Sequence, residues 1–145
     1  MAAISRSRCR EWALQVLYQA EYVGHRQGET IRFYRHFEAV HGETPAYLVR
    51  LVEGVTAHQE ELDKLIRQYS ENWRLERMAA VDRNILRLAL YELLHEPDVP
   101  AKVVINEAVE LAKQYGSEES GSFINGILDR IRQNVGRDVE VKEGK

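Results

Sequence analysis

The sequence is poor in residues that crosslink or interrupt a chain. Its 145 residues include one cysteine and only three prolines, and the nine glycines form no glycine-rich stretch. The single cysteine, Cys9, excludes an internal disulfide, and the scarcity of helix breakers favours a helical protein. No apolar run approaches the roughly eighteen residues needed to span a bilayer, and no signal-peptide pattern follows the first residue. We therefore expect a cytoplasmic protein without membrane contact.

Signatures of catalysis and cofactor binding are also lacking. The five histidines stand in different segments without metal-ligand spacing, at His25, His36, His41, His58 and His95. The small residues of GSEESGS come with two acids and no lysine, so they do not form a phosphate-binding loop. We expect no enzyme activity, no metal and no cofactor.

The composition is that of one helical globular domain. Hydrophobic residues make up 44% and charged residues 30%, the net charge is −3, and the pI is near 6.0. This balance argues against a protein that coats nucleic acid over its whole surface, but it leaves room for a local basic site. Apolar residues recur with a helical period, without strand patterns or repeats. The predicted helices run from Ser5 to before Gly24 and over residues 31–40, 44–69 with a kink near Gly54, 78–94, 101–115 and 117–135.

Local signals mark where several of these helices begin and end. Ser5 is the expected N-cap of the first helix, and Thr44 followed by Pro45 is expected to cap the third. Gly116 is expected to end its helix in the left-handed conformation, and Ser117 to cap the next one. The stretch EPDVP separates the central helix from its successor, because proline and the residue before it both resist helical geometry.

The first helix opens on three arginines at alternate positions. Arg6, Arg8 and Arg10 precede any acid, and on a helical wheel Arg6 and Arg10 flank the apolar stripe while Arg8 points outward. Arginine contacts phosphates bidentately and stacks on unpaired bases, so the cluster favours a site for single-stranded nucleic acid. The alternative is a set of solvated charges without a ligand.

The first helix also carries a second apolar stripe. Leu14, Tyr18 and Tyr22 recur at every fourth position, on the side opposite the stripe that contains Trp12 and Val16. Either other helices of the same chain cover both sides, or the second side meets a partner protein, since aromatic residues beside charged ones are typical of binding surfaces.

Three longer segments resemble one bacterial family. REWALQVLYQAE lies near the start, VDRNILRLALYEL in the central helix, and DVPAKVVINEAVELAKQYGSEESGSFINGILDRI over the last two helices. The combination of VINEAVELAK and FINGILD is similar to the NusB family of transcription antitermination factors. The resemblance covers the chain except residues 22 to about 46 and the tail. The same signature occurs in a domain fused to ribosomal-RNA cytosine methyltransferases, and no methyltransferase part is expected here.

The resemblance implies an all-α fold, a NusB-like helical bundle of two packed subdomains with three to four helices each. We expect one domain over residues 1–136, divided into an N-terminal subdomain of about 5–72 and a C-terminal subdomain of about 73–136, with a flexible tail over 137–145. The implied function involves no catalysis. Family members bind boxA-type single-stranded RNA together with NusE, a small-subunit ribosomal protein. The complex acts on RNA polymerase, mainly at ribosomal RNA operons, and some members form homodimers.

The resemblance assigns RNA contacts at several places in the chain. The matching residues are Arg6, Arg8 and Arg10 at the start, Arg87 in the central helix, Lys102 after it, and Ser117, Glu118, Glu119 and Phe123 near the last turn. Carboxylates at such a site accept hydrogen bonds from base amino groups, which gives specificity rather than affinity. Phe123 is expected to stack on a base or, alternatively, to lie in the core. Ser7 stands where family members often carry another arginine, so a weaker boxA affinity is expected.

The resemblance also assigns a protein-binding site. Tyr18 and Asp82 match positions that face NusE in the family, and the stripe of Leu14, Tyr18 and Tyr22 would extend that surface. The rival explanation for Asp82 is a first-turn acid that stabilises its own helix. The alternative for the whole protein is a homo-oligomeric helical adaptor without direct RNA binding, in which this stripe meets a second copy.

Overall fold

The computed structural model describes residues 4–23, 27–70 and 74–136, and for residues 22–23 and 27–31 it describes the backbone alone. This part of the chain forms seven α-helices and one short 3-10 helix, and it contains no strand. The elements are α1 (Arg6–Val23), α2 (Gln27–His41), α3 (Ala46–Ala57), α4 (Gln59–Tyr69), η1 (Leu75–Arg77), α5 (Ala80–His95), α6 (Ala101–Tyr115) and α7 (Ser120–Val135). The prediction of an all-α fold is therefore confirmed.

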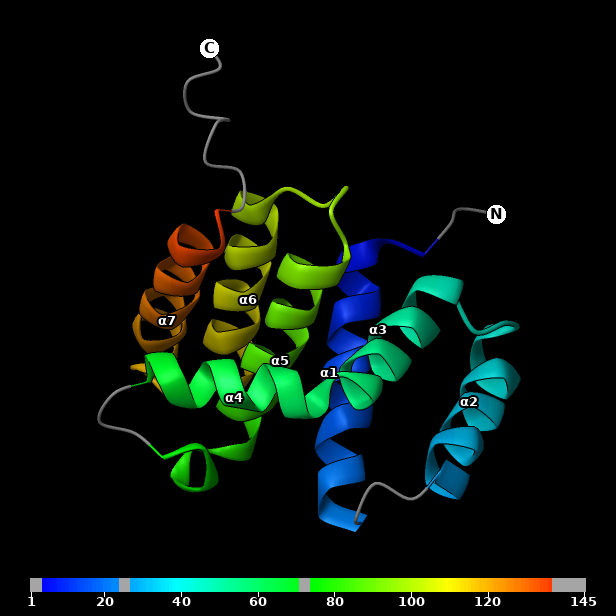
Figure 1. The fold of residues 1–145 in the computed structure, drawn as a ribbon. Helices are drawn as coiled ribbons and strands as arrows, with labels where there is room; N and C mark the ends of the chain where they lie inside the picture. The colour runs from blue at the N-terminus through cyan, green and yellow to red at the C-terminus, as the bar shows by residue number, and fades with distance from the viewer. Residues whose placement is uncertain (1–3, 24–26, 71–73, 137–145) are drawn as a thin grey trace.

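Helix α5 lies at the centre of the bundle. It packs against α1 and α3 on one side and against α6 and α7 on the other, and α4 runs across it (Figure 1). Helices α6 and α7 form an antiparallel pair, and α1 also contacts α2. The central helix thus joins elements from both expected subdomains. The expected boundary between residues 72 and 73 and the expected tail over 137–145 lie outside the described residues.

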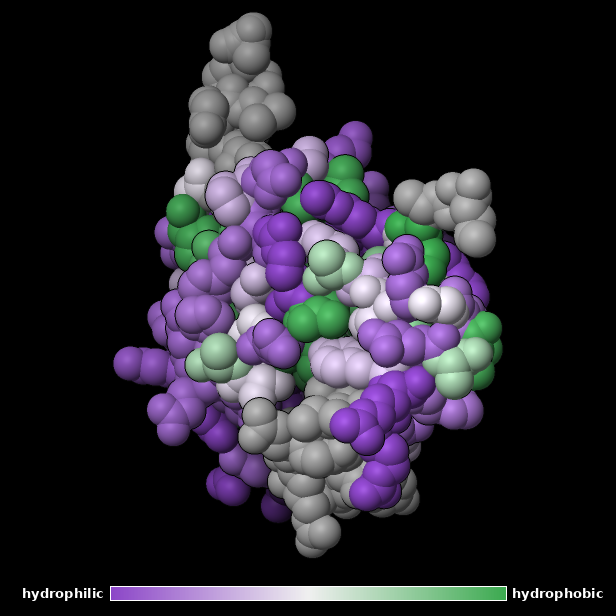
Figure 2. Space-filling model, turned by 90° about the vertical axis from the view of Figure 1, so that its right-hand side faces the viewer, coloured by the Kyte–Doolittle hydropathy of each residue, from purple (hydrophilic) through white to green (hydrophobic). Residues whose placement is uncertain are grey.

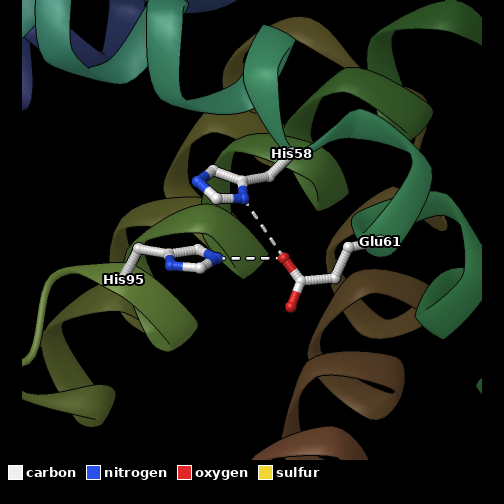
Figure 3. A group of neighbouring side chains, drawn as sticks. All are labelled: His58, Glu61 and His95. Carbon is white, nitrogen blue, oxygen red and sulfur yellow. Dashed lines mark hydrogen bonds and ion pairs between the residues drawn. The ribbon is translucent and has the colours of Figure 1, made fainter.

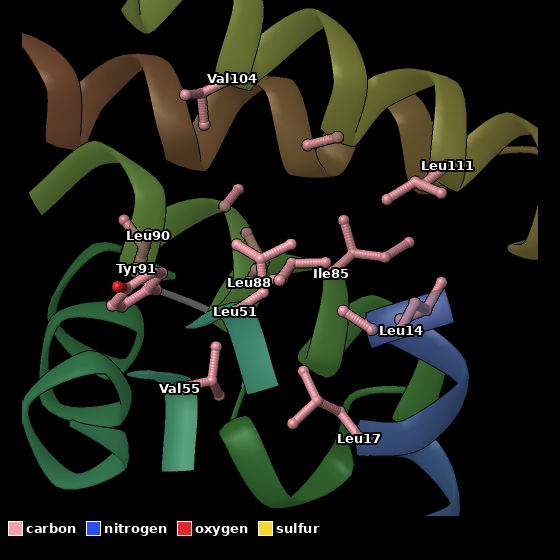
Figure 4. Packing of buried hydrophobic residues seen from close by; sticks show 14 of the residues in the cluster. Leu14, Leu17, Leu51, Val55, Ile85, Leu88, Leu90, Tyr91, Val104 and Leu111 are labelled. Atoms are coloured by element: carbon pink, nitrogen blue, oxygen red, sulfur yellow. The ribbon is translucent and has the colours of Figure 1, made fainter. Parts of the chain in front are cut away.

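The position of α5 follows from its sequence, which is apolar around most of its circumference. Its residues 84–93 are all buried. In Figure 4, Leu14 and Leu17 of α1 lie on one side of the Ile85 side chain, and Leu111 of α6 lies on the other. Burying one such side chain stabilises the fold by about 1.5–3 kcal/mol. This shared core fixes the helix ends, and the surface side chains that they carry, relative to one another.

The single long helix predicted over residues 44–69 is instead two helices. α3 ends at Ala57, α4 begins at Gln59, and His58 between them has φ −109° and ψ 15°. The His58 N–H still donates to the Gly54 carbonyl (3.1 Å), so the chain turns without losing that backbone hydrogen bond. The turn lets α3 pack against α1 while α4 packs against α7. The spacing of apolar residues gives no sign of this break, because each of the two helices packs a row of apolar side chains against α5.

The predicted cap is confirmed for α1 and wrong for α3. The Ser5 hydroxyl accepts a hydrogen bond from the Arg8 N–H (3.1 Å), as an N-cap does. The N-cap of α3 is Pro45, without a side-chain cap. Thr44 donates to the Glu38 carboxylate instead (3.2 Å). Its hydroxyl therefore ties the end of α2 to the loop rather than capping α3.

The turn between α6 and α7 also differs from the prediction. Gly116 has φ −99°, outside the left-handed region, and α7 takes Glu119 rather than Ser117 as its N-cap. The Ser117 N–H donates to Ser120 Oγ (2.9 Å), and a Cβ on Gly116 would lie 2.6 Å from the same oxygen. The glycine is needed here for close approach, not for a positive φ.

Gly54 allows α3 to lie directly against the ring of Tyr91 in α5. A Cβ at position 54 would lie 2.2, 2.4 and 2.9 Å from three ring atoms. The ring is buried, and its hydroxyl donates to the Glu96 carboxylate (2.7 Å), so it is held in place. Helix α3 continues through Gly54, the chain turns four residues later at His58, and the glycine provides space between two helices.

The face that carries α2 is mostly hydrophilic, with isolated apolar side chains (Figure 2). Val40, which is 62% exposed, is among the large apolar side chains at the surface. Scattered apolar residues of this kind are normal for a solvated surface. Within the described ranges, every helix is too short or too polar to cross a bilayer.

Candidate RNA and protein interface

Two guanidinium groups from the start of α1 reach the surface. The side chains of Arg6 and Arg8 are 48% and 56% exposed. Arg8 pairs with Glu11 one turn later (2.9 Å) and lies 4.9 Å from the centre of the Trp12 ring. Arg6 lies 3.9 Å from Asp98, in the loop before α6. Neighbouring groups therefore orient both arginines, while about half of each side chain remains accessible.

Tyr47 and Arg50 of α3 join this surface, although the sequence analysis did not select them. The guanidinium groups of Arg6 and Arg50 lie 4.4 Å and 5.6 Å from the centre of the Tyr47 ring. Arg50 is 56% exposed and pairs with Glu96. Tyr47 and Arg50 are three residues apart and share one face of α3, but no sequence signal places that face beside α1. We call Arg6, Arg8, Tyr47 and Arg50 the arginine surface.

Arg10 is buried, which corrects the expectation that it contributes to an exposed RNA-binding edge. Its side chain is 4% exposed, and it donates hydrogen bonds of 2.8, 3.1 and 2.9 Å to the Glu92 carboxylate. Glu107 of α6 lies 3.4 Å away, and the Tyr47 hydroxyl also donates to Glu92. Burial by itself would lower the pKa of Arg10. The hydrogen bonds and the negative charge of Glu92 outweigh the effect of burial, so the pKa of Arg10 is raised. Arg10 joins α1 to α5 and α6.

Arg87 is also buried, so the expectation that it contacts RNA from the central helix is wrong. Arg87 donates to the Asp63 carboxylate of α4 (2.8 and 3.0 Å). Glu21 of α1 accepts from Arg83 (2.7 and 2.9 Å) and lies 3.3 Å from Arg87. Burial on its own would raise the pKa of Glu21, but Arg83 and Arg87 outweigh it and lower that pKa. Arg83 and Arg87 therefore belong to a network of ion pairs that joins α5 to α1 and α4.

The second apolar stripe of α1 is not a continuous surface. Leu14 is 3% exposed and belongs to the core, because α3 and α5 both cover α1. The expectation that Leu14 faces a partner protein is therefore wrong. Tyr18 is 38% exposed, and the Tyr22 side chain lies outside the described residues. Of the two stripe residues whose side chains are described, Tyr18 alone reaches the surface.

Tyr18 belongs to the last part of α1 and Asp82 to the first turn of α5, and both helix ends lie at the opposite end of the bundle from the start of α1 (Figure 1). Tyr18 lines a hollow together with Ala80 and Arg83 from the start of α5. Asp82 lines a second hollow at the same helix end, of about 710 Å³. Its Oδ1 atom is buried, and the described part of the chain offers it no hydrogen-bond partner. The two residues assigned to a protein partner therefore flank one helix terminus.

The turn between α6 and α7 borders the same hollow as Asp82. Ser117, Glu119 and Phe123 line it, with the two polar residues exposed and Phe123 half-buried against the core. Glu118 is exposed and faces a different hollow, between α6 and α7. Phe123 thus combines a core contact with an edge on the surface, so both of its expected roles stay open.

A furrow between α6 and α7 leads from this turn towards Lys102. One hollow is lined by Asp98, Lys102 and Asn106, and another by Asn106, Ser117 and Glu118, so the two meet at Asn106. Helix α6 has 15 residues, which corresponds to about 22 Å at about 1.5 Å per residue. The surface residues expected to bind RNA are therefore divided between two ends of the bundle, with a furrow along α6 and α7 between them.

The structure also brings His95, at the end of α5, to two neighbouring residues of the α3–α4 turn. His58, Glu61 and His95 place ligand atoms within 4.8 Å of one another (Figure 3). The lone cysteine, Cys9, lies in the core, and its burial raises the pKa of the thiol.

Sequence comparison connects this architecture to known proteins. The model of the NusB family matches residues 7–133. Transcription antitermination protein NusB from Anaeromyxobacter dehalogenans is 52% identical over 131 residues, which cover 90% of this chain and 92% of the relative. The NusB protein of Desulfitobacterium hafniense is 47% identical over 137 residues, which cover 92% of each chain.

Solved structures agree with the sequence matches. NusB from T. maritima superposes with a TM-score of 0.78 at 38% identity, covering 91% of this chain and 93% of that one. A crystal structure of antitermination factors NusB and NusE in complex with double-stranded RNA gives a TM-score of 0.74 at 29% identity, covering 90% and 99%. With a family match across almost the whole described length and relatives near half identity, this chain belongs to the NusB family.

Proposed function

We propose that this chain is a non-catalytic, RNA-binding transcription antitermination factor of the cytoplasm. It binds boxA-type single-stranded RNA together with a NusE-type ribosomal protein and acts on RNA polymerase, mainly at ribosomal RNA operons. The observation that carries the proposal is the exposure of Arg6 and Arg8 beside Tyr47 and Arg50, in a chain of the NusB family. The solved complex of NusB, NusE and RNA supports both classes of partner.

The arginine surface is the proposed phosphate-binding end. Guanidinium groups bind phosphate oxygens bidentately and lose little hydration on contact, so Arg6, Arg8 and Arg50 suit a short stretch of RNA backbone. Lys102 would add a point charge on the way to the furrow between α6 and α7. At the far end, Ser117 and the neighbouring carboxylates would contact base edges, which gives selectivity without adding attraction for phosphate.

The protein partner is proposed to bind around the first turn of α5. The buried Asp82 Oδ1 atom lacks a donor within the described chain, and a buried acceptor without a donor costs about 1–3 kcal/mol. A donor from the partner would remove that cost. Tyr18 lies at the same end with 38% of its surface exposed, and it would supply apolar contact area beside this hydrogen bond.

The RNA part of the proposal is tested by fluorescence anisotropy with a labelled boxA RNA, across a salt series and with or without NusE. The double variant Arg6→Ala/Arg8→Ala should bind more weakly, and its log–log salt slope should be shallower by about 1.4, at about 0.7 per lost phosphate contact on a single strand. Arg35→Ala, an exposed arginine on α2, is the matched control and should bind as the parent does. Equal losses in both variants would contradict a local site.

The partner part is tested in the same assay. NusE should tighten RNA binding by the parent chain, and Asp82→Asn should reduce that gain while leaving RNA binding without NusE unchanged. Glu53→Gln, an exposed acid on α3, serves as the control. No RNA retention even with NusE, together with a concentration-dependent dimer by sedimentation, would instead favour the homo-oligomeric adaptor.

A further inference from the structure

Three potential metal ligands converge where α3, α4 and α5 meet. His58 stands at the turn between α3 and α4, Glu61 follows in the first turn of α4, and His95 is the last residue of α5. His58 Nδ1 lies 3.4 Å and His95 Nε2 lies 3.0 Å from the same carboxylate oxygen, Glu61 Oε1 (Figure 3). The side chains are 41%, 50% and 29% exposed, in chain order, so an ion has access from solvent.

The two imidazole rings are held in position by stacking. Their centroids lie 3.9 Å apart with an angle of 20° between the ring planes. Tyr91 packs beside both rings, with its centroid 5.5 Å from that of His95 and 6.2 Å from that of His58. The Tyr91 hydroxyl is anchored by Glu96 (2.7 Å). The stack keeps both rings beside Glu61, but near-parallel rings point their in-plane lone pairs side by side, so binding of one ion requires at least one ring to turn.

The two nitrogen–oxygen distances lie close to those of a tetrahedral zinc site. Bonds of about 2.0–2.1 Å at tetrahedral angles place neighbouring ligand atoms about 3.3–3.4 Å apart. The two nitrogen–oxygen distances of 3.4 and 3.0 Å are already close to this value, and all three ligand atoms lie within 4.8 Å of one another. The rings are partly exposed, so turning them out of their stack would close the remaining gap and direct both nitrogen lone pairs, which lie in the ring planes, at one ion.

We propose that His58, Glu61 and His95 form a binding site for a divalent transition-metal ion of the zinc type. Two imidazoles and one carboxylate favour such an ion over Mg²⁺ or Ca²⁺, which bind through oxygen ligands. Three protein ligands leave the fourth position to water or to a group from a partner. The bound ion would fasten the turn between α3 and α4 to the end of α5, and so stabilise the fold at a place distant from Tyr18 and Asp82.

The test is a titration of the tag-free, full-length protein with zinc chloride by isothermal calorimetry. One ion per chain is expected. Loss of a supporting hydrogen bond around a metal already costs about 10–100-fold in affinity, so loss of a ligand in His95→Gln or Glu61→Gln should cost at least about 100-fold. His36→Gln and Glu60→Gln, an exposed histidine on α2 and the exposed acid next to Glu61, are the matched controls and should bind zinc as the parent does.

Two further measurements make the result decisive. Circular dichroism establishes that each variant keeps the parent's helicity, and the thermal midpoint should rise with zinc in the parent and the controls but not in His95→Gln. Nitrogen-15 spectra of the histidine rings should show zinc-dependent shifts at His58 Nδ1 and His95 Nε2. Absence of stoichiometric binding, or binding that the ligand variants leave unchanged, would overturn the proposal and reduce the cluster to a hydrogen-bonded triad.

Discussion

Replacing Arg10 should unfold the protein more readily without removing a direct RNA contact. Arg10 and Glu92 are 4% and 2% exposed, and three hydrogen bonds of 2.8–3.1 Å join them across α1 and α5. Arg10→Ala leaves the Glu92 carboxylate buried, with the Tyr47 hydroxyl as its remaining donor from this set. Breaking a buried ion pair by removing one member costs about 3–5 kcal/mol. That is a large part of the total stability of about 5–15 kcal/mol expected for a domain.

The measurement is urea and thermal unfolding followed by circular dichroism. At about 2–4 °C per kcal/mol for a chain of this size, the midpoint of Arg10→Ala should fall by about 6–20 °C. Arg8→Ala, two residues earlier on the same helix but exposed, should stay within about 0.5 kcal/mol of the parent. RNA affinity, measured well below the midpoint of the variant, should be nearly unchanged for Arg10→Ala and reduced for Arg8→Ala.

A second variant separates the charge from the packing. Replacing both members of the pair, as Arg10→Met with Glu92→Leu, removes the two buried charges together, and such exchanges are often neutral or stabilising. The double variant should therefore recover much of the stability that Arg10→Ala loses. An Arg10→Ala protein with the parent's unfolding midpoint and strongly weakened RNA binding would refute this reasoning.

Further predictions concern packing, pH and capping. Gly54→Ala should destabilise by about 1 kcal/mol in urea unfolding, because overpacking against Tyr91 costs about 1–3 kcal/mol and the gain in helix propensity recovers at most about 1 kcal/mol; a more stable variant would contradict this. The pKa of Glu21 lies below its usual 4.5, so its ion pair with Arg83 contributes stability above that pH, and this contribution is lost as pH falls through the folded-state pKa. Glu21→Gln should consequently lose less stability than the parent between pH 6 and pH 3, and parallel pH profiles would count against the ion pair. Ser5→Ala should cost about 1 kcal/mol in thermal unfolding with helicity otherwise retained, and no change would exclude a capping role.

Helical periodicity predicted the fold class and most helix locations correctly, because local sequence decides which residues can share one apolar side. The predictions from periodicity were wrong where contacts between distant parts of the chain determine the local structure. The apolar row runs through His58 without interruption, yet the chain turns there so that α3 and α4 can pack against different neighbours. The role of Gly54 depended in the same way on the Tyr91 ring from a distant helix.

The candidate site divides along the same line. The sequence by itself determined that three arginines open the first helix, and its resemblance to the NusB family led to the expectation that they contact RNA. Only the tertiary structure decided which of them are accessible. Arg6 and Arg8 remain exposed, whereas Arg10 forms a buried ion pair with Glu92, which lies 82 residues away along the chain. The physical reason is that the helical period fixes only the direction in which each side chain leaves its own helix. Whether that side chain is exposed, and which charge it pairs with, depends on the other helices that pack against that side.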